Sequence, residues 1–226
     1  MSETWNLPTI ERSSTIEQTH RLLRDAIVEG SIPQGTHLRE LHLANTLRTS
    51  RGTVREAIRQ LVQEGLAEYQ LHRGTFVRAF SPGDRLDVYV AREAIEVGVA
   101  TRLLDMDGEL DLRGMKEALG ELRRAAKNRT RPTERVMAAD VRFHRELVAL
   151  AQSPRLDRAY ETLSAETRML LRHHPVYPWR RYVADHEQLL DAVRDRDVRL
   201  PELVAAHLRL SADLIGSELA AEAIVG

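Results

Sequence analysis

The stretch "TSRGTVREAIRQLVQEGL", residues 49–66, combines the pattern of an amphipathic helix with a concentration of arginine. Ser50 is a candidate N-cap, and Gly65 is a residue at which such a helix can end. At about 100° per residue, the apolar positions share one arc that predicts a buried face, formed by Val54, Ala57, Ile58 and Leu61. Arg51, Arg55 and Arg59 form a strip beside this arc, so the helix should present a row of guanidinium groups to solvent.

The segments around this helix predict a winged helix-turn-helix. An apolar helical stripe between residues 16 and 27 stops at Gly30, and a short helix is expected over residues 39–47. After the arginine-rich helix, two short strand candidates, "LAEYQ" and "TFVRA", are joined by "LHRG". Gly74 in this connection can adopt the positive φ that a hairpin turn needs. Three helices followed by a two-stranded wing make up a winged helix-turn-helix.

Positive charge is concentrated on the arginine-rich helix. The whole chain of 226 residues carries a formal net charge of −1, whereas residues 46–60 contain four arginines and one glutamate, a local charge of +3. An arginine can chelate O6 and N7 of guanine, and the N-terminal end of a recognition helix reaches base edges in the major groove. Exposed arginines alone are typical of any solvated helix face. Inside a helix-turn-helix that is followed by a wing, they predict double-stranded DNA as the partner.

Composition excludes several classes of protein. The chain contains no cysteine, which excludes disulfides, thiolate nucleophiles and cysteine-ligated zinc. No apolar run approaches the roughly 20 residues that a membrane-spanning helix needs, and the N-terminal residues lack the pattern of a secretion signal. We therefore expect a cytoplasmic protein with no membrane partner.

The pattern of the chain changes near residue 80. Glycine and proline become sparse after residue 83, and the remaining sequence shows successive long amphipathic helices. The stretch "AFSPGD" interrupts both periodicities and predicts a boundary over residues 79–83. We expect a mainly α protein with a winged helix-turn-helix domain over residues 1–80 and an all-α antiparallel helical-bundle domain over residues 81–226.

Residues 27–77 resemble the DNA-binding domain of the GntR family of bacterial transcription regulators. The motifs that carry this resemblance are "GSIPQGTHL", the "LA" of the second helix, "SRGTVREA" and "RGTFV". By position, the resemblance implies DNA contacts from the recognition helix and the wing tip, at Ser50, Arg51, Thr53, Arg55, His72, Arg73 and Gly74. Two residues depart from the family pattern. Arg48 replaces a small turn residue and Gly52 replaces a larger one, so the operator sequence stays open.

Three C-terminal segments each place a histidine on their predicted buried face. Asp140 and His144 lie four residues apart on the apolar face of residues 134–151, and His186 and His207 are in phase with apolar residues of later segments. A single histidine of this kind is usually a core residue with a hydrogen-bond partner. Several buried polar groups in one bundle all need partners, and one metal ion would satisfy all four. Three imidazoles and a carboxylate suit Zn, Ni, Mn, Fe or Co, and suit Ca or Mg poorly.

Residues 85–220 resemble the FCD effector domain of FadR-type GntR regulators, in its metal-binding version. The motifs are "D-x-x-FH-x-x-L", "H-x-x-L-x-x-A" and a histidine 21 residues after His186. The resemblance implies that one divalent transition metal per chain, with zinc as the first choice, is held by Asp140, His144, His186 and His207. It also implies open coordination positions at which a small organic acid binds as the effector.

An arginine in the first helix of such domains often pairs with the carboxylate of the effector. The segment "YVAREAIE" offers Arg92 for this role. The alternative is that Arg92 is a surface arginine that pairs with Glu96 at i, i+4. Arg168 and Arg172 are weaker candidates of the same type.

These features together predict a ligand-responsive transcription regulator, with repression as the expected logic, rather than an enzyme. It would bind a palindromic operator as a homodimer, because one helix-turn-helix reads only a half-site. Two alternatives use the same residues. The site of three histidines and one aspartate could belong to a metal-dependent enzyme, or the metal itself could be the signal.

Overall fold

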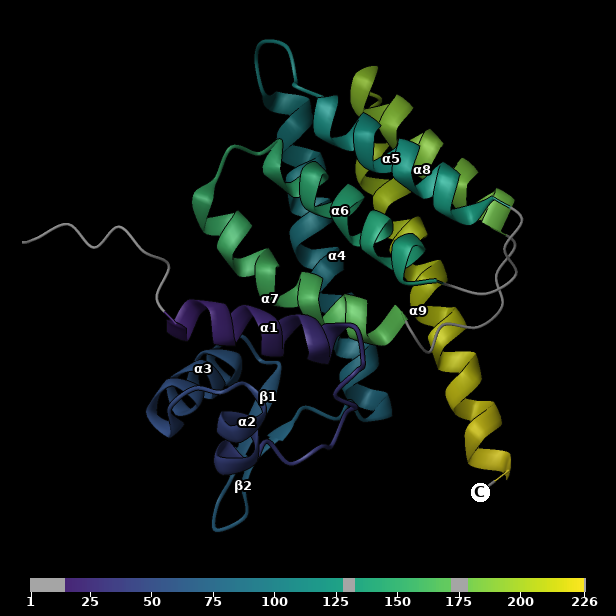
Figure 1. Ribbon diagram of the computed structural model, residues 1–226. Coiled ribbons are helices and arrows are strands. Elements are labelled where there is room, and N and C mark those ends of the chain that lie inside the picture. The colour runs from purple at the N-terminus through teal and green to yellow at the C-terminus, as the bar shows by residue number, and fades with distance from the viewer. Residues whose placement is uncertain (1–14, 128–132, 172–178, 226) are drawn as a thin grey trace, which may run out of the picture.

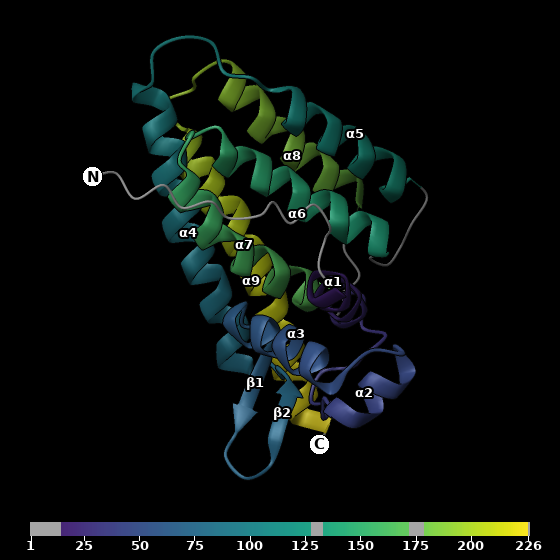
Figure 2. The ribbon, with the colours of Figure 1, turned by 60° about the vertical axis from the view of Figure 1, so that its left-hand side comes forward.

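The computed structural model describes residues 15–127, 133–171 and 179–225, and these are mainly helical. The N-terminal elements are α1 (Thr15–Val28), α2 (Glu40–Thr46), α3 (Arg51–Gln63), β1 (Ala67–Gln70) and β2 (Gly74–Val77). They are followed by α4 (Pro82–Asp105), α5 (Arg113–Ala126), α6 (Glu134–Ala149), α7 (Pro154–Leu171), α8 (Trp179–Arg194) and α9 (Leu200–Val225). Figures 1 and 2 show the three short helices and the hairpin at one end of the molecule and the long helices packed together at the other. The predicted fold class is confirmed.

The helix α3 begins as the sequence predicts. Ser50 is its N-cap and accepts a hydrogen bond of 3.0 Å from the backbone N–H of Thr53. The four predicted apolar positions are all buried. Helix α3 ends at Gln63, and Gly65 follows with a φ of +75° that closes the helix. The helix expected over residues 39–47 is one residue shorter at each end, as α2.

The wing is an antiparallel hairpin in which Ala67 pairs with Val77 and Gln70 with Gly74. Gly74 adopts the expected positive φ, at +102°. A Cβ atom at Gly74 would lie 2.6 Å from Nε2 of His37, so glycine is needed here for space as well as for conformation. The second strand begins at Gly74 and ends at Val77, one to two residues earlier than predicted.

The start of the long-helix bundle is defined by a capping box at α4. Ser81 accepts a hydrogen bond from the backbone N–H of Asp84, while the Asp84 carboxylate accepts one from the backbone N–H of Ser81. From there α4 packs along α9, and α6 packs against both α5 and α7. Their inward faces form a core of fully buried side chains that includes Met115, Leu122, Phe143, Leu147, Leu189 and Val204. The capping box thus fixes the first turn of the helix on which Arg92 and Glu96 lie.

The N-terminal core is completed by the bundle. Ala165, Met169 and Leu170 of α7 pack with residues of the winged helix-turn-helix in one buried cluster. No local pattern in the sequence indicates this contact, because more than eighty residues of chain separate these three residues from the wing. The two parts of the protein therefore share a core.

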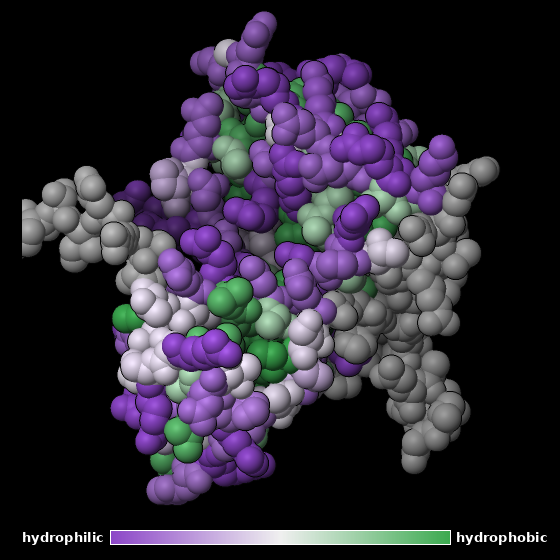
Figure 3. Space-filling view, viewed as in Figure 1, coloured by the Kyte–Doolittle hydropathy of each residue, from purple (hydrophilic) through white to green (hydrophobic). Residues whose placement is uncertain are grey.

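Polar side chains cover most of the molecular face in Figure 3, and apolar side chains appear on it in small patches. Within the described ranges, none of the helices has the length and apolar character that crossing a membrane requires.

Gly52, inside α3, and Gly65, just after its C-terminal end, provide a matched test of this fold. Gly65→Ala should lower the free energy of unfolding by about 1–2 kcal/mol, because alanine is strained at positive φ. Its Cβ would also lie 3.2 Å from Oε1 of Glu166. Gly52→Ala should raise stability by roughly 0.5 kcal/mol, because Gly52 is helical and a Cβ there would meet nothing closer than Ser50 Oγ at 3.7 Å. Urea unfolding of both variants measures these changes in the free energy of unfolding. Changes of the same sign and size in both variants would contradict the prediction.

Candidate metal centre and nucleic-acid interface

Three helices bring one aspartate and three histidines together inside the bundle. Asp140 and His144 come from α6, His186 from α8 and His207 from α9. One potential ligand atom from each residue lies within 4.8 Å of the others, and all four residues are buried. The inward faces predicted from the sequence thus converge on one point. Their role as metal ligands stays a prediction.

The closest distances within this Asp/His cluster join atoms that would carry lone pairs. Nε2 of His144 lies 3.2 Å from Nε2 of His207. Nε2 of His186 lies 3.0 Å from Oδ1 of Asp140, and Nε2 of His144 lies 3.9 Å from the same oxygen. All three imidazoles therefore turn the same ring nitrogen, Nε2, toward the centre of the cluster.

The other ring nitrogens of two histidines are already committed to acceptors. Nδ1 of His186 lies 2.8 Å from the backbone oxygen of Tyr182, and Nδ1 of His144 lies 2.6 Å from Oε2 of Glu96. A carbonyl or carboxylate oxygen only accepts, so Nδ1 carries the hydrogen and the neutral ring keeps its lone pair on Nε2. These lone pairs face each other and a carboxylate, an arrangement that a cation would stabilise. The residues present therefore fit a transition metal, with outer contacts that orient the ligands as they do in known metal sites.

Burial and neighbouring charges favour the protonation states that metal binding needs. Burial, together with the nearby His186 and His144, lowers the pKa of His207 well below its usual value. Burial opposes ionisation of Asp140, but its contacts with His186 and His144 and the positive charge of Arg92 hold its pKa well below the usual range. A neutral imidazole and an ionised carboxylate are the forms that ligate metals.

Arg92 lies at the edge of the cluster and is buried, with 2% of its surface exposed. The alternative of a surface arginine is therefore wrong about exposure, although the expected pairing with Glu96 is present, with Nε 2.8 Å from Oε1. Nε of Arg92 also donates to the hydroxyl of Tyr160 over 3.2 Å. Burial opposes ionisation of Glu96, but the charge of Arg92 and the hydrogen bonds that Glu96 accepts from His144 and Tyr160 lower its pKa to about 2. Among the described residues, Nη2 of Arg92 has no hydrogen-bond partner.

The two weaker arginine candidates do not reach this site. Arg168 on α7 is paired with Glu134, with its Nε 2.7 Å from Oε1. Arg172 lies outside the described residues.

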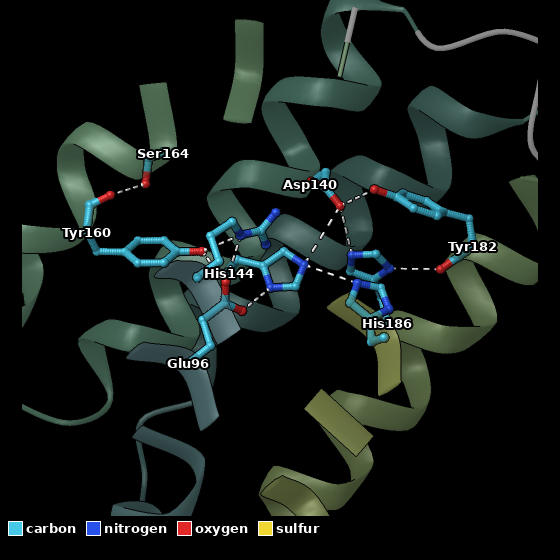
Figure 4. Close-up of polar contacts among 9 residues, drawn as sticks. Glu96, Asp140, His144, Tyr160, Ser164, Tyr182 and His186 are labelled. Atoms are coloured by element: carbon cyan, nitrogen blue, oxygen red, sulfur yellow. Dashed lines mark hydrogen bonds and ion pairs between the residues drawn. The ribbon is translucent and has the colours of Figure 1, made fainter. Parts of the chain in front are cut away.

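Two tyrosines complete the cluster from opposite sides, and neither was assigned a role from the sequence. Tyr182 donates its hydroxyl hydrogen to Oδ1 of Asp140, and Tyr160 donates to Oε1 of Glu96 (Figure 4). Tyr182 precedes His186 by four residues, so its place on the same face could have been found from helical spacing. Tyr160 reaches a partner 64 residues away in the chain, and no local pattern indicates that contact.

The candidate DNA-contacting residues of α3 lie at the surface. The side chains of Arg51 and Arg55 are 61% and 64% exposed. Arg55 makes two hydrogen bonds of 2.8 Å to the carboxylate of Glu40 on α2, so that binding to a base or phosphate would require an exchange of partners. Ser50 and Thr53 lie at the N-terminal end of α3, with their hydroxyl oxygens 2.8 Å apart.

The wing tip carries the remaining candidates. His72 has a φ of +62°, which places it in the tight turn between the strands. The guanidinium of Arg73 lies over the ring of Phe76, 5.4 Å from its centroid. In Figure 1 the hairpin projects from the end of the molecule that also carries α2 and α3. The candidates of α3 and of the wing therefore lie in the same part of the molecule.

Comparison with known proteins agrees with both halves of this description. Residues 15–77 match the family model of bacterial regulatory proteins of the gntR family, and residues 87–210 match that of the FCD domain. The chain is 30% identical over 202 residues to a "Probable D-xylose utilization operon transcriptional repressor" of Paenarthrobacter nicotinovorans, covering 88% of this chain and 87% of that protein. It is 28% identical over 184 residues to the transcriptional repressor RspR of Escherichia coli K12, covering 80% and 79%.

Solved structures show the same architecture. A GntR transcriptional regulator from Rhodococcus sp. RHA1 superposes with a TM-score of 0.75 at 27% identity, covering 90% of this chain and 98% of that one. E. coli McbR/YncC has a TM-score of 0.76 at 18% identity and supports the fold alone. The chain therefore belongs to the GntR family of bacterial transcriptional regulators and carries an FCD domain after its winged helix-turn-helix.

Proposed function

We propose that this regulator binds a palindromic operator as a homodimer and that a small carboxylate, bound beside a metal ion in the FCD domain, changes its affinity for that operator. The observation that carries the proposal is the convergence of three Nε2 atoms and a carboxylate oxygen inside the bundle. Repression as the logic is supported by relatives that are named repressors. The family consists of transcriptional regulators and not of enzymes.

We assign residues 1–80 to operator recognition and residues 81–226 to effector binding. We assign base and phosphate contacts to the N-terminal end of α3 and to the wing, at Ser50, Arg51, Thr53, Arg55, His72, Arg73 and Gly74. A homodimer would place two copies of α3 on two half-sites, which matches the symmetry of a palindrome. Because such an operator lies on chromosomal DNA, we expect the protein to work in the cytoplasm.

In the effector half of the proposal, Asp140, His144, His186 and His207 would hold one divalent transition metal, and zinc suits three nitrogens and one oxygen. A bound ion supplies positive charge and open coordination positions for an anion. Arg92 would supply a second anchor, since its Nη2 is buried and has no partner among the described residues. Glu96 keeps the rest of that guanidinium in place. A carboxylate between the ion and Arg92 would satisfy both.

The contribution of α3 can be tested with single alanine variants. Arg51→Ala and Arg55→Ala should each weaken binding to a duplex selected by the wild-type protein from random sequences, by about 1–3 kcal/mol if they read bases. Arg113→Ala is the matched control, because the Arg113 side chain is 84% exposed and pairs with Asp111 in the C-terminal bundle, far from α3. Fluorescence anisotropy at constant salt measures the affinities. Wild-type affinity in both variants would reject the assignment.

The metal ligands can be tested by metal content and stability together. Wild-type protein should contain about one transition-metal ion per chain, and a chelator should lower its melting temperature, because the ion binds only the folded state. The variant with His144→Ala and His207→Ala should contain no such metal and should not respond to chelator. His42→Ala, at an exposed histidine, is the control. Mass spectrometry of the metal and thermal unfolding make the measurement, and unchanged metal in the double variant would refute this ligand set.

The role of Arg92 can be tested with a lysine that keeps its charge beside Glu96. In a melting-temperature screen with acetate, lactate and citrate, Arg92→Lys should bind the acid that stabilises the wild type about tenfold more weakly. The reason is that lysine cannot supply the second donor of the guanidinium. Arg168→Lys is the control, because Arg168 is paired with Glu134 instead. If no acid stabilises the wild type while operator affinity follows zinc concentration, the metal itself is the signal and the effector assignment is wrong.

A further inference from the structure

One helix, α7, contacts both the candidate metal centre and the DNA-binding part of the chain. In Figures 1 and 2 it lies between the bundle and α1, and it packs against α1, α4 and α6. We propose that α7 transmits the state of the Asp/His cluster to the recognition helix, with Tyr160 as the positioning residue at the cluster end. This inference rests on the proposed function and adds the route by which the effector site acts on DNA binding.

At the cluster end, α7 is attached through a chain of buried polar contacts. Tyr160 is 3% exposed, and its hydroxyl group donates to Glu96. The other oxygen of Glu96 lies 2.6 Å from Nδ1 of His144. Figure 4 shows Tyr160 reaching across to Glu96 on the side of His144 that faces away from Asp140. A change in the position of the His144 ring is therefore transmitted to α7 through one intervening side chain, that of Glu96.

At the DNA-binding end, α7 lies against Gly65, two residues after the end of the recognition helix. Gly65, which closes α3, has no side chain, and a Cβ there would lie 3.2 Å from Oε1 of Glu166 and 3.3 Å from Cγ2 of Thr162. Glu166 also accepts a hydrogen bond of 2.7 Å from Nη1 of Arg78, which directly follows the wing. The same short segment of α7 thus contacts the ends of both DNA-reading elements.

A second ion-pair network and a shared core hold this contact together. Arg24 of α1 pairs with Glu64 at the end of α3 and with Glu161 of α7, at 3.2 and 3.3 Å. Met169 and Leu170 are each 2% exposed, within the N-terminal core. Because these residues and Tyr160 lie within about 15 Å on one continuous helix, a small shift or rotation at Tyr160 moves the whole contact.

The structure also offers a matched comparison on the other side of the cluster. Tyr182 of α8 makes a hydroxyl contact with Asp140 that mirrors the contact of Tyr160 with Glu96. Among the described residues, α8 packs mainly on α5 and α9. Tyr160→Phe and Tyr182→Phe therefore each remove one buried hydroxyl group next to the cluster, but only the first removes a contact of α7.

The test is hydrogen exchange of the full-length, metal-free protein with and without added zinc. In the wild type, zinc should slow amide exchange in α6, α8 and α9 at the cluster and change it by about fivefold or more in α1 and α3. Tyr160→Phe should keep the local slowing and lose the remote change. Tyr182→Phe should keep both.

Each other outcome has a distinct meaning. A remote change that persists in Tyr160→Phe would overturn the role of α7 and leave α4, which runs from the wing into the bundle, as the route. Local slowing without any remote change in the wild type would also overturn the inference while leaving the metal site in place. No local slowing in the wild type would refute the proposed metal site itself. Should Tyr160→Phe fail to fold, Glu166→Gln cuts the same route at its other end and should likewise lose only the remote change.

Discussion

The convergence of three imidazole nitrogens and one carboxylate oxygen in the bundle interior constrains most of the C-terminal part of this protein. In a medium of low dielectric constant, lone pairs that face each other without a donor or cation are unfavourable by several kcal/mol. The Nδ1 atoms of His144 and His186 are bound to Glu96 and Tyr182, so their protons cannot be moved to the centre without losing those bonds. A cation at this point would resolve the conflict for α6, α8 and α9 together, and would explain why three helices present polar atoms to a core that is otherwise apolar.

The groups around the cluster follow from the same constraint. Glu96 is fully buried and ionised, and it is stable there because Arg92, Tyr160 and His144 all bind its two oxygens. Each of these partners compensates part of the buried charge. This arrangement also makes α4 and α7 sensitive to the cluster, because Arg92 and Tyr160 belong to those two helices.

The sequence predicted what depends on local periodicity and missed what depends on distant packing. The helix α3, its cap at Ser50 and the turn at Gly74 are set by residues that are near neighbours, so spacing and residue type were enough. The four cluster residues were found because each lies in phase with an apolar helix face. Glu96 was recognised only as a partner of Arg92, and Tyr160 was not recognised, because their contacts with the cluster join helices whose relative rotation is set by tertiary packing. The contribution of α7 to the N-terminal core is of the same kind.

The shared core limits how an effector can alter DNA binding. Burial of the Met169 and Leu170 side chains stabilises the shared core by about 1.5–3 kcal/mol for each side chain. Ala165 and two ion-pair networks add to this stabilisation. Detaching the winged helix-turn-helix from α7 would therefore cost more than the roughly 1–3 kcal/mol of a typical allosteric coupling. Under the proposed function, a ligand at the cluster would therefore tilt α7 with the DNA-binding part attached rather than release that part. In a dimer, the expected consequence is a change in the relative orientation of the two recognition helices, with each winged helix-turn-helix still packed on its own bundle.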